Sequence, residues 1–297
     1  MFDFRYHALS LTAVFIALAV GLLLGVAIGD SGLVSSAERN IRESLRQDVA
    51  NADRHVKQAR VDIARSKRFE QEVYPLLVDG RLQGRSVGVV FLGDSDKTIG
   101  DDVRDALRDT GATIRSVAAT GTRPDLAEAG RAAAGSRYEA LAATPEPELD
   151  LVGDFGFRIG AQYVRPGKLL AREREVVFDT FNPSSGELLP VDAVVVVHDR
   201  AKTGASYDRS ARDRFDEQLV QGIKESQIPV VGVERSSTDP SVISWYKDRG
   251  ISSVDDVDET SGRAALVFAL EGREGAFGRK DSAGDGLLPD VVGPNAP

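Results

Sequence analysis

The feature that most constrains this chain is an uncharged segment near its N-terminus, residues 8 to 29. Its 22 residues include no Asp, Glu, Lys or Arg, and Val, Ile and Leu recur through it. At about 1.5 Å per residue, a helix of this length crosses the hydrocarbon core of a bilayer. The segment therefore predicts a transmembrane helix that follows a short N-terminal tail, residues 1 to 7.

A cleaved secretory signal is the alternative interpretation of this segment. Gly25-Val26-Ala27 resembles a cleavage site with small residues. The apolar run is longer than the usual core of a signal peptide, which favours an uncleaved anchor. Positive charges flank both ends of the helix, so their distribution does not decide its orientation in the membrane.

Small residues recur at four-residue intervals within the predicted span and form one stripe along a helix: Ala13, Ala17, Gly21, Gly25 and Gly29. Such a stripe allows two membrane helices to approach closely, as in the GxxxG pattern. It predicts a homodimer that packs through this face. The alternative is that Ala and Gly are simply frequent in membrane helices.

A helical stalk is predicted for residues 30 to 83. Residues 35 to 74 contain neither Pro nor Gly, and apolar residues recur at alternating spacings of four and three, which is typical of a coiled coil. The seam consists of Leu45, Val49, Ala52, Val56, Ala59 and Ile63. Because alanine fills several core positions, the coiled coil would be weak. The alternative is a single helix that packs on its own domain. Pro75 and the turns at Gly80 and Gly84 predict the end of the stalk.

Strands and helices alternate from residue 84 to residue 272. Strands are expected at 87–92, 113–117, 193–197, 230–233 and 251–254, and helices at 101–109, 208–226, 240–249 and 262–272. Val194 to Val197 form a continuous apolar run, which is typical of a strand buried on both faces of a parallel sheet. This pattern predicts a doubly wound, flavodoxin-like α/β domain.

Two segments depart from this alternation. Residues 118 to 190 have mainly helical patterns and predict a helical insertion between the second and third strands. Residues 273 to 297 are rich in Gly, Asp and Pro and predict a disordered tail.

Composition excludes some classes of function. Residues 84 to 297 contain 26 Lys and Arg against 36 Asp and Glu, so the domain lacks the cationic surface that nucleic acid requires. The chain has no Cys and a single Met, and it therefore lacks the soft ligands that Cu(I) prefers.

No established catalytic or phosphate-binding motif occurs in the sequence. The loop after the first strand, residues 93 to 100, is neither a dinucleotide-binding loop nor a P-loop, and its aspartates would repel phosphate. H-E-x-x-H is also absent, and Gly84-Arg85-Ser86-Val87-Gly88 matches G-x-S-x-G only in its letters, because it leads into a predicted strand and not from a strand into a helix. We therefore expect that the chain is not an enzyme.

Polar side chains follow three of the predicted strands: Asp94 and Asp96 after the first, His198 and Asp199 after the third, and Glu234 after the fourth. Open α/β sheets bind ligands beyond the carboxyl ends of their strands, where the strand order reverses. These five residues are the candidates for a metal site or for acid-base groups. The alternative is that they only end strands and cap helices.

The segment Phe4-Arg5-Tyr6-His7-Ala8-Leu9-Ser10-Leu11, with its continuation through Gly21 to Gly25, resembles the N-terminus of the mycobacterial copper transport protein B (MctB) family. The order of anchor, stalk and α/β domain also resembles that family over most of the chain. The resemblance implies a cell-membrane protein with its soluble domain on the extracytoplasmic side, which acts in copper transport or homeostasis with copper as a possible ligand.

The same resemblance leaves a second function open. The family is also implicated in cell-envelope and division assemblies, which implies a non-catalytic dimeric scaffold that presents its α/β domain to an envelope or division protein. Because a single apolar helix cannot line a pore without oligomerising, direct copper translocation by one chain is chemically unfavourable.

Overall fold

The computed structural model describes residues 4–29, 33–121, 125–198 and 206–290. It divides into two compact units, Met1–Arg68 and Phe69–Pro297. Helix α1, Phe4–Gly29, and most of helix α2, Leu33–Val78, belong to the first unit. The end of α2 and all the strands belong to the second unit.

Helix α1 confirms the predicted apolar helix. Among the described residues, one helix is long and apolar enough to cross a membrane, over Tyr6–Ala27. None of this span is buried within the protein, and large apolar side chains such as Leu22 and Leu23 are about 70% exposed. An apolar surface of this size is unfavourable in water, so the helix requires lipid or another helix around it.

Helix α2 continues through Pro75 and ends at Val78, before the predicted turn at Gly80. A proline removes one backbone donor from a helix, and here the last turns are held by tertiary packing. Tyr74 and Val78 are buried in the α/β unit, and the Tyr74 hydroxyl donates a hydrogen bond of 2.7 Å to the Ala106 carbonyl. The last part of α2 is therefore a structural part of the α/β unit.

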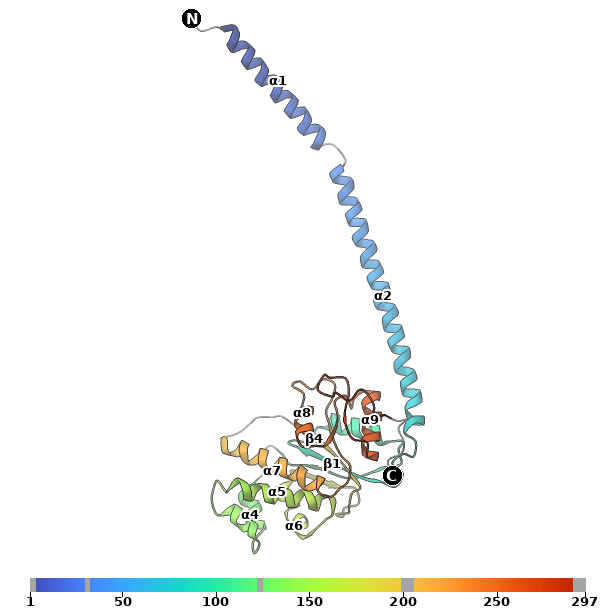
Figure 1. The fold of residues 1–297 in the computed structure, drawn as a ribbon, viewed down its shortest axis with the longest axis vertical. Helices are drawn as coiled ribbons and strands as arrows, with labels where there is room; N and C mark the ends of the chain where they lie inside the picture. The colour runs from blue at the N-terminus through green and yellow to red at the C-terminus, as the bar shows by residue number, and fades with distance from the viewer. Residues whose placement is uncertain (1–3, 30–32, 122–124, 199–205, 291–297) are drawn as a thin grey trace. The chain divides into compact units, whose positions relative to one another are not determined.

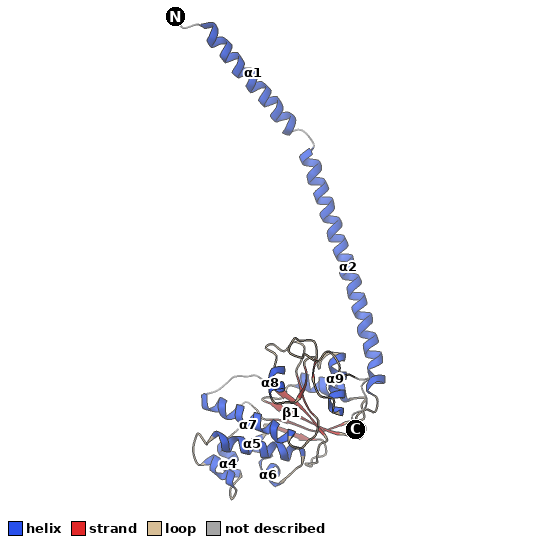
Figure 2. Ribbon diagram, viewed as in Figure 1, coloured by secondary structure: helices blue, strands red, loops and turns tan. Residues whose placement is uncertain are grey.

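A seven-stranded sheet forms the centre of the second unit (Figure 2). Its order is β3-β2-β1-β4-β5-β6-β7. The strands are β1 Ser86–Leu92, β2 Thr113–Ala119, β3 Thr180–Pro183, β4 Ala193–His198, β5 Val230–Val233, β6 Ser252–Val254 and β7 Ala276–Phe277. All neighbours pair in parallel except β3, which runs antiparallel to β2. The strand order reverses between β1 and β4, the two strands at the centre of the sheet.

Helices cover both faces of this sheet, as predicted for a doubly wound α/β unit. The end of α2, α3 Lys97–Leu107 and α9 Thr260–Glu271 pack on one face. The opposite face carries α4 Leu126–Ala132, the 3-10 helix η1 Arg137–Ala142, α5 Leu149–Val164, α6 Lys168–Val177, α7 Ser206–Lys224 and α8 Ile243–Asp248. Val194 and Val196 face one core and Val195 and Val197 the other, because successive side chains of a strand alternate.

Helices α5 and α7 lie side by side and pack unusually closely (Figure 1). A Cβ atom built on Gly160 of α5 would lie 1.9 Å from the Leu219 carbonyl oxygen of α7. A Cβ atom on Gly222 of α7 would lie 2.0 Å from the Phe157 carbonyl oxygen of α5. Glycine is therefore required on both helices, because the two backbones are in direct contact.

The predicted helical insertion is only partly a separate feature. Residues 118 to 190 do contain α4, η1, α5 and α6, but they also contain the edge strand β3. Helix α5 packs on α7 and contributes Phe155 and Ile159 to the main core. The prediction missed β3 because it is a four-residue strand without a run of apolar residues.

The prediction of a disordered tail from residue 273 was wrong for the described residues up to 290. This segment contains β7, and Ala276, Phe277 and Ala283 are buried. The Asp255 carboxylate accepts hydrogen bonds of 2.8 Å from the backbone amides of Arg279 and Lys280. Composition misled the prediction, because the segment is held by backbone hydrogen bonds and buried charges and contains few apolar residues.

Candidate functional site

Asp94 and Asp96 follow β1, as predicted, and both are exposed. The Asp96 carboxylate accepts a hydrogen bond of 2.7 Å from the Thr98 amide and a longer one from the Ile99 amide. It is therefore the N-cap of α3. For Asp96 the structure supports the capping role that the sequence left as the alternative.

His198 ends β4 and lies in an aromatic stack. Its backbone amide donates a hydrogen bond of 2.9 Å to the Tyr246 hydroxyl. The imidazole packs on the Trp245 ring with 4.3 Å between the ring centroids. The Arg249 guanidinium lies 3.9 Å from the centroid of the same indole. Trp245 is the single tryptophan of the chain, so this stack gives the α/β unit its own fluorescent reporter.

Glu234 follows β5 and is almost completely buried, with 2% of its surface exposed. One carboxylate oxygen accepts hydrogen bonds from the Ser241 hydroxyl at 2.7 Å and from the Lys280 ammonium at 2.6 Å. The other accepts the Val242 amide at 2.6 Å. The carboxylate of Glu234 is therefore paired with a lysine of the same chain.

The candidate residues do not form one metal site in the part of the chain that the structure describes. No group of three or more His, Asp or Glu side chains there is close enough to hold a metal ion. Asp199 lies outside the described residues. His198 contacts Trp245, while Glu234 is bound to Lys280, Ser241 and Val242.

Sequence reasoning missed a buried polar cluster at the carboxyl end of β2. Thr120, Arg212 and Asp216 are all at least nine-tenths buried, and the Thr120 hydroxyl donates a hydrogen bond of 3.4 Å to the Asp216 carboxylate. Burial raises the pKa of Asp216 to about 7, although the nearby Arg212 charge opposes this shift. Arg212 and Asp216 lie at i and i+4 beside the apolar face of α7, a position that does not distinguish a buried polar residue from an exposed one in the sequence.

Ion pairs close the carboxyl end of β5 and β6. The Asp102 carboxylate of α3 lies 2.9 Å from the Arg235 guanidinium and 3.5 Å from that of Arg263. Asp256 follows β6 and is fully buried, and burial raises its pKa to about 6. Charged side chains of the protein itself therefore occupy the carboxyl ends of β5 and β6.

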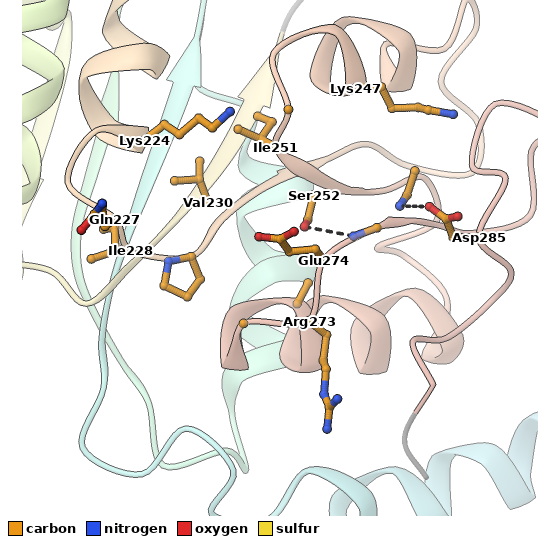
Figure 3. Close-up of a pocket in the computed structure, with 16 residues that line it drawn as sticks. Lys224, Gln227, Ile228, Val230, Lys247, Ile251, Ser252, Arg273, Glu274 and Asp285 are labelled. Atoms are coloured by element: carbon orange, nitrogen blue, oxygen red, sulfur yellow. Dashed lines mark hydrogen bonds between the residues drawn. The ribbon is translucent and has the colours of Figure 1, made fainter. Parts of the chain in front are cut away.

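A hollow of about 670 Å³ lies at the opposite end of β5, β6 and β7 (Figure 3). Lys224 and Lys247 lie along it, and Figure 3 shows Glu274 beside Ser252. The Lys224 ammonium donates a hydrogen bond of 2.9 Å to the Arg249 carbonyl. Charges of both signs line the hollow at the amino ends of the strands, which is not the end where doubly wound sheets usually bind ligands.

Two apolar surfaces of the first unit are open. On α1, a shallow groove is lined by Ala17, Gly21 and Gly25 between larger residues, and a Cβ atom on either glycine would meet nothing within 4 Å. On α2, the apolar seam residues are between 50% and 61% exposed: Leu45, Val49, Val56 and Ile63.

Comparison with known proteins decides the family. The family model described as "Copper transport outer membrane protein, MctB" matches residues 1–288. The chain belongs to the MctB family. This confirms the resemblance seen at the N-terminus of the sequence.

Two relatives are similar to this chain over nearly their whole length. They are the "Copper transporter MctB" proteins of Mycobacterium bovis (strain ATCC BAA-935 / AF2122/97) and of Mycobacterium tuberculosis (strain ATCC 25618 / H37Rv). Each is 26% identical over 301 residues, which cover 91% of this chain and 92% of the relative. With its apolar helix α1, the chain is a single-pass, membrane-anchored member of the MctB family.

Proposed function

We propose that this protein acts in copper transport or homeostasis as a membrane-anchored homodimer, with its α/β unit on the extracytoplasmic side of the cell membrane. The dimer is supported by two exposed apolar surfaces, one along α1 and one along α2. The copper role rests on the names of the MctB relatives.

The groove on α1 fits a second copy of the same helix. Small residues at positions 17, 21 and 25 allow two backbones to approach, and van der Waals packing then drives association within the lipid. Two copies anchored in the same orientation bring their α2 helices together in parallel. The exposed seam of α2 would then be covered as a weak coiled coil.

Copper would be handled by an assembly that contains this chain, because one apolar helix has no polar surface for an ion. The chain has no Cys and one Met, so Cu(I) finds few of its preferred ligands. His198 beside Trp245 is the position from which a copper contact would come, at the reversal of a flavodoxin-like sheet. We propose no catalytic step for the chain.

The alternative function is a non-catalytic scaffold of the cell envelope. Two observations favour this alternative. The apolar seam of α2 is exposed, and ion pairs occupy the end of the sheet where β5 and β6 have their carboxyl ends. In this alternative the stalk pairs two chains and presents the α/β units to an envelope or division protein.

Single cysteines test the dimer without background, because the chain contains no cysteine. We expect Gly21→Cys and Val56→Cys to form intermolecular disulfides in membranes under mild oxidation. The matched controls are Leu23→Cys and Arg54→Cys, which lie on the opposite faces of α1 and α2. Equal cross-linking at all four positions, or none at Gly21 and Val56, would contradict the dimer.

Copper measurements separate the two functions. We expect cells that lack this protein to differ from wild type in copper content and in growth on copper, and the wild-type gene to restore both. The variant Gly21→Leu with Gly25→Leu should fail to restore them, whereas Leu22→Ile with Leu23→Ile should succeed. Unchanged copper content after deletion would favour the scaffold.

Calorimetry of the full chain in nanodiscs with Cu(II) adds a direct measurement. Micromolar binding that is lost in His198→Ala would support direct copper handling by this chain. A micromolar dissociation constant corresponds to about 8 kcal/mol of binding free energy.

A further inference from the structure

After the carboxyl end of β5, oxygen atoms of residues 234 to 241 surround the Lys280 ammonium, and we call this group of oxygens the Glu234 pocket. The Lys280 ammonium lies 2.6 Å from a Glu234 carboxylate oxygen, 3.1 Å from the Arg235 carbonyl and 2.8 Å from the Thr238 carbonyl. The Ser241 hydroxyl donates to the same carboxylate oxygen at 2.7 Å. One carboxylate and two carbonyls therefore converge on one positive charge.

This pocket is formed by residues 234 to 241, which are distant in sequence from its occupant. Glu234 is held independently of Lys280, because its second oxygen accepts the Val242 amide at 2.6 Å. If Lys280 were removed, the loop would therefore still present the buried Glu234 carboxylate and the carbonyls of Arg235 and Thr238. A buried, uncompensated carboxylate is costly, so an empty pocket would favour the uptake of another cation.

Lys280 belongs to a segment that follows β7, residues 278 to 286, which we call the strap. Few apolar side chains hold the strap, and most of its contacts are hydrogen bonds. The Asp255 carboxylate accepts hydrogen bonds from two backbone amides of the strap, and the Asp285 carboxylate accepts one from the Ala276 amide. Among the described residues, the Lys280–Glu234 pair is the one ion pair between the strap and the loop that follows β5.

We infer that the Glu234 pocket is a binding site for a hard monovalent cation of the size of an ammonium ion, of which K⁺ is the natural example, and that Lys280 is its tethered occupant. The oxygen ligands exclude a preference for soft Cu(I) and suit an alkali cation. A free cation in the pocket displaces Lys280 and releases the strap from the carboxyl edge. This inference does not rest on the copper function.

The first test is thermal unfolding of the full chain in detergent micelles, followed by Trp245 fluorescence. In Lys280→Met, we expect KCl to raise the unfolding midpoint relative to choline chloride of equal ionic strength. At tenfold the dissociation constant, the rise would be about 3 to 6 °C. Glu234→Gln with Lys280→Met should lose this difference, because the pocket no longer carries a charge.

The control is Lys247→Met, which removes a lysine near the strap but outside the pocket. If Lys280→Met folds only when KCl is present and not in choline chloride, that result also supports the site. Equal behaviour of Lys280→Met in the two salts, folded or unfolded, would overturn the inference.

The second test addresses the strap of the otherwise unaltered protein. Ser282→Cys places the single thiol of the chain in the strap, where Ser282 lies 3.2 Å from Ser241. We expect maleimide to label this thiol faster in KCl than in choline chloride. Equal rates would show that K⁺ does not release the strap and would overturn that part of the inference.

Discussion

Alanine at Gly160 is expected to lower the free energy of unfolding of the α/β unit by about 3 kcal/mol, at the upper end of overpacking effects. The new Cβ atom would be 1.9 Å from the Leu219 carbonyl, and α5 and α7 would have to separate. Backbone atoms cannot move aside as the end of a flexible side chain can. Gly222→Ala, which meets the Phe157 carbonyl at 2.0 Å, should have a similar effect. The measurement is urea unfolding followed by Trp245 fluorescence.

The matched control is Gly100→Ala in α3. The nearest atom to a Cβ at this position is 3.8 Å away, and the residue lies within a helix. Alanine should therefore stabilise the protein by about 0.5 to 1 kcal/mol through helix propensity. A Gly160→Ala variant that is as stable as wild type would show that the two helices are not in backbone contact.

The second large effect concerns the membrane anchor. Arginine at both Ile16 and Leu23 should move the chain from the membrane to the soluble fraction. An arginine at the centre of a span costs about 3 kcal/mol and one nearer its end costs less, so the pair costs more than about 3 kcal/mol. Both residues lie on the side of α1 away from the small-residue groove, so the effect would not come from dimer packing.

Fractionation followed by immunoblotting measures this effect, and Ile16→Leu with Leu23→Ile is the control that should remain in the membrane. Two results would contradict the anchor: retention of the double-arginine variant in membranes, or a wild-type soluble chain that begins near Ile28.

Much of the α/β unit could be predicted from local patterns. The run Val194 to Val197 predicted a central parallel strand, and the structure has β4 there between β1 and β5. The short strands β3 and β7 could not be predicted, because four and two residues are too few for a pattern of alternation. Their hydrogen bonds to β2 and β6 define them as strands.

The candidate site was predicted less well. Glu234 was a candidate metal ligand, whereas in the structure its carboxylate pairs with Lys280, which is 46 residues away in a segment that was expected to be disordered. Arg212 and Asp216 were missed because a polar residue beside an apolar helix face gives no sign of whether the fold buries it.

The sequence by itself determined the membrane anchor, the alternation of strands and helices, and the resemblance to the MctB family. These properties depend on hydropathy and spacing between near neighbours, which the order of residues contains directly. Only the tertiary structure decided that Lys280 pairs with Glu234, and that Gly160 and Gly222 bring two helices into contact. Each of these roles is set by burial and by partners distant in sequence, and both arise only when the chain folds on itself.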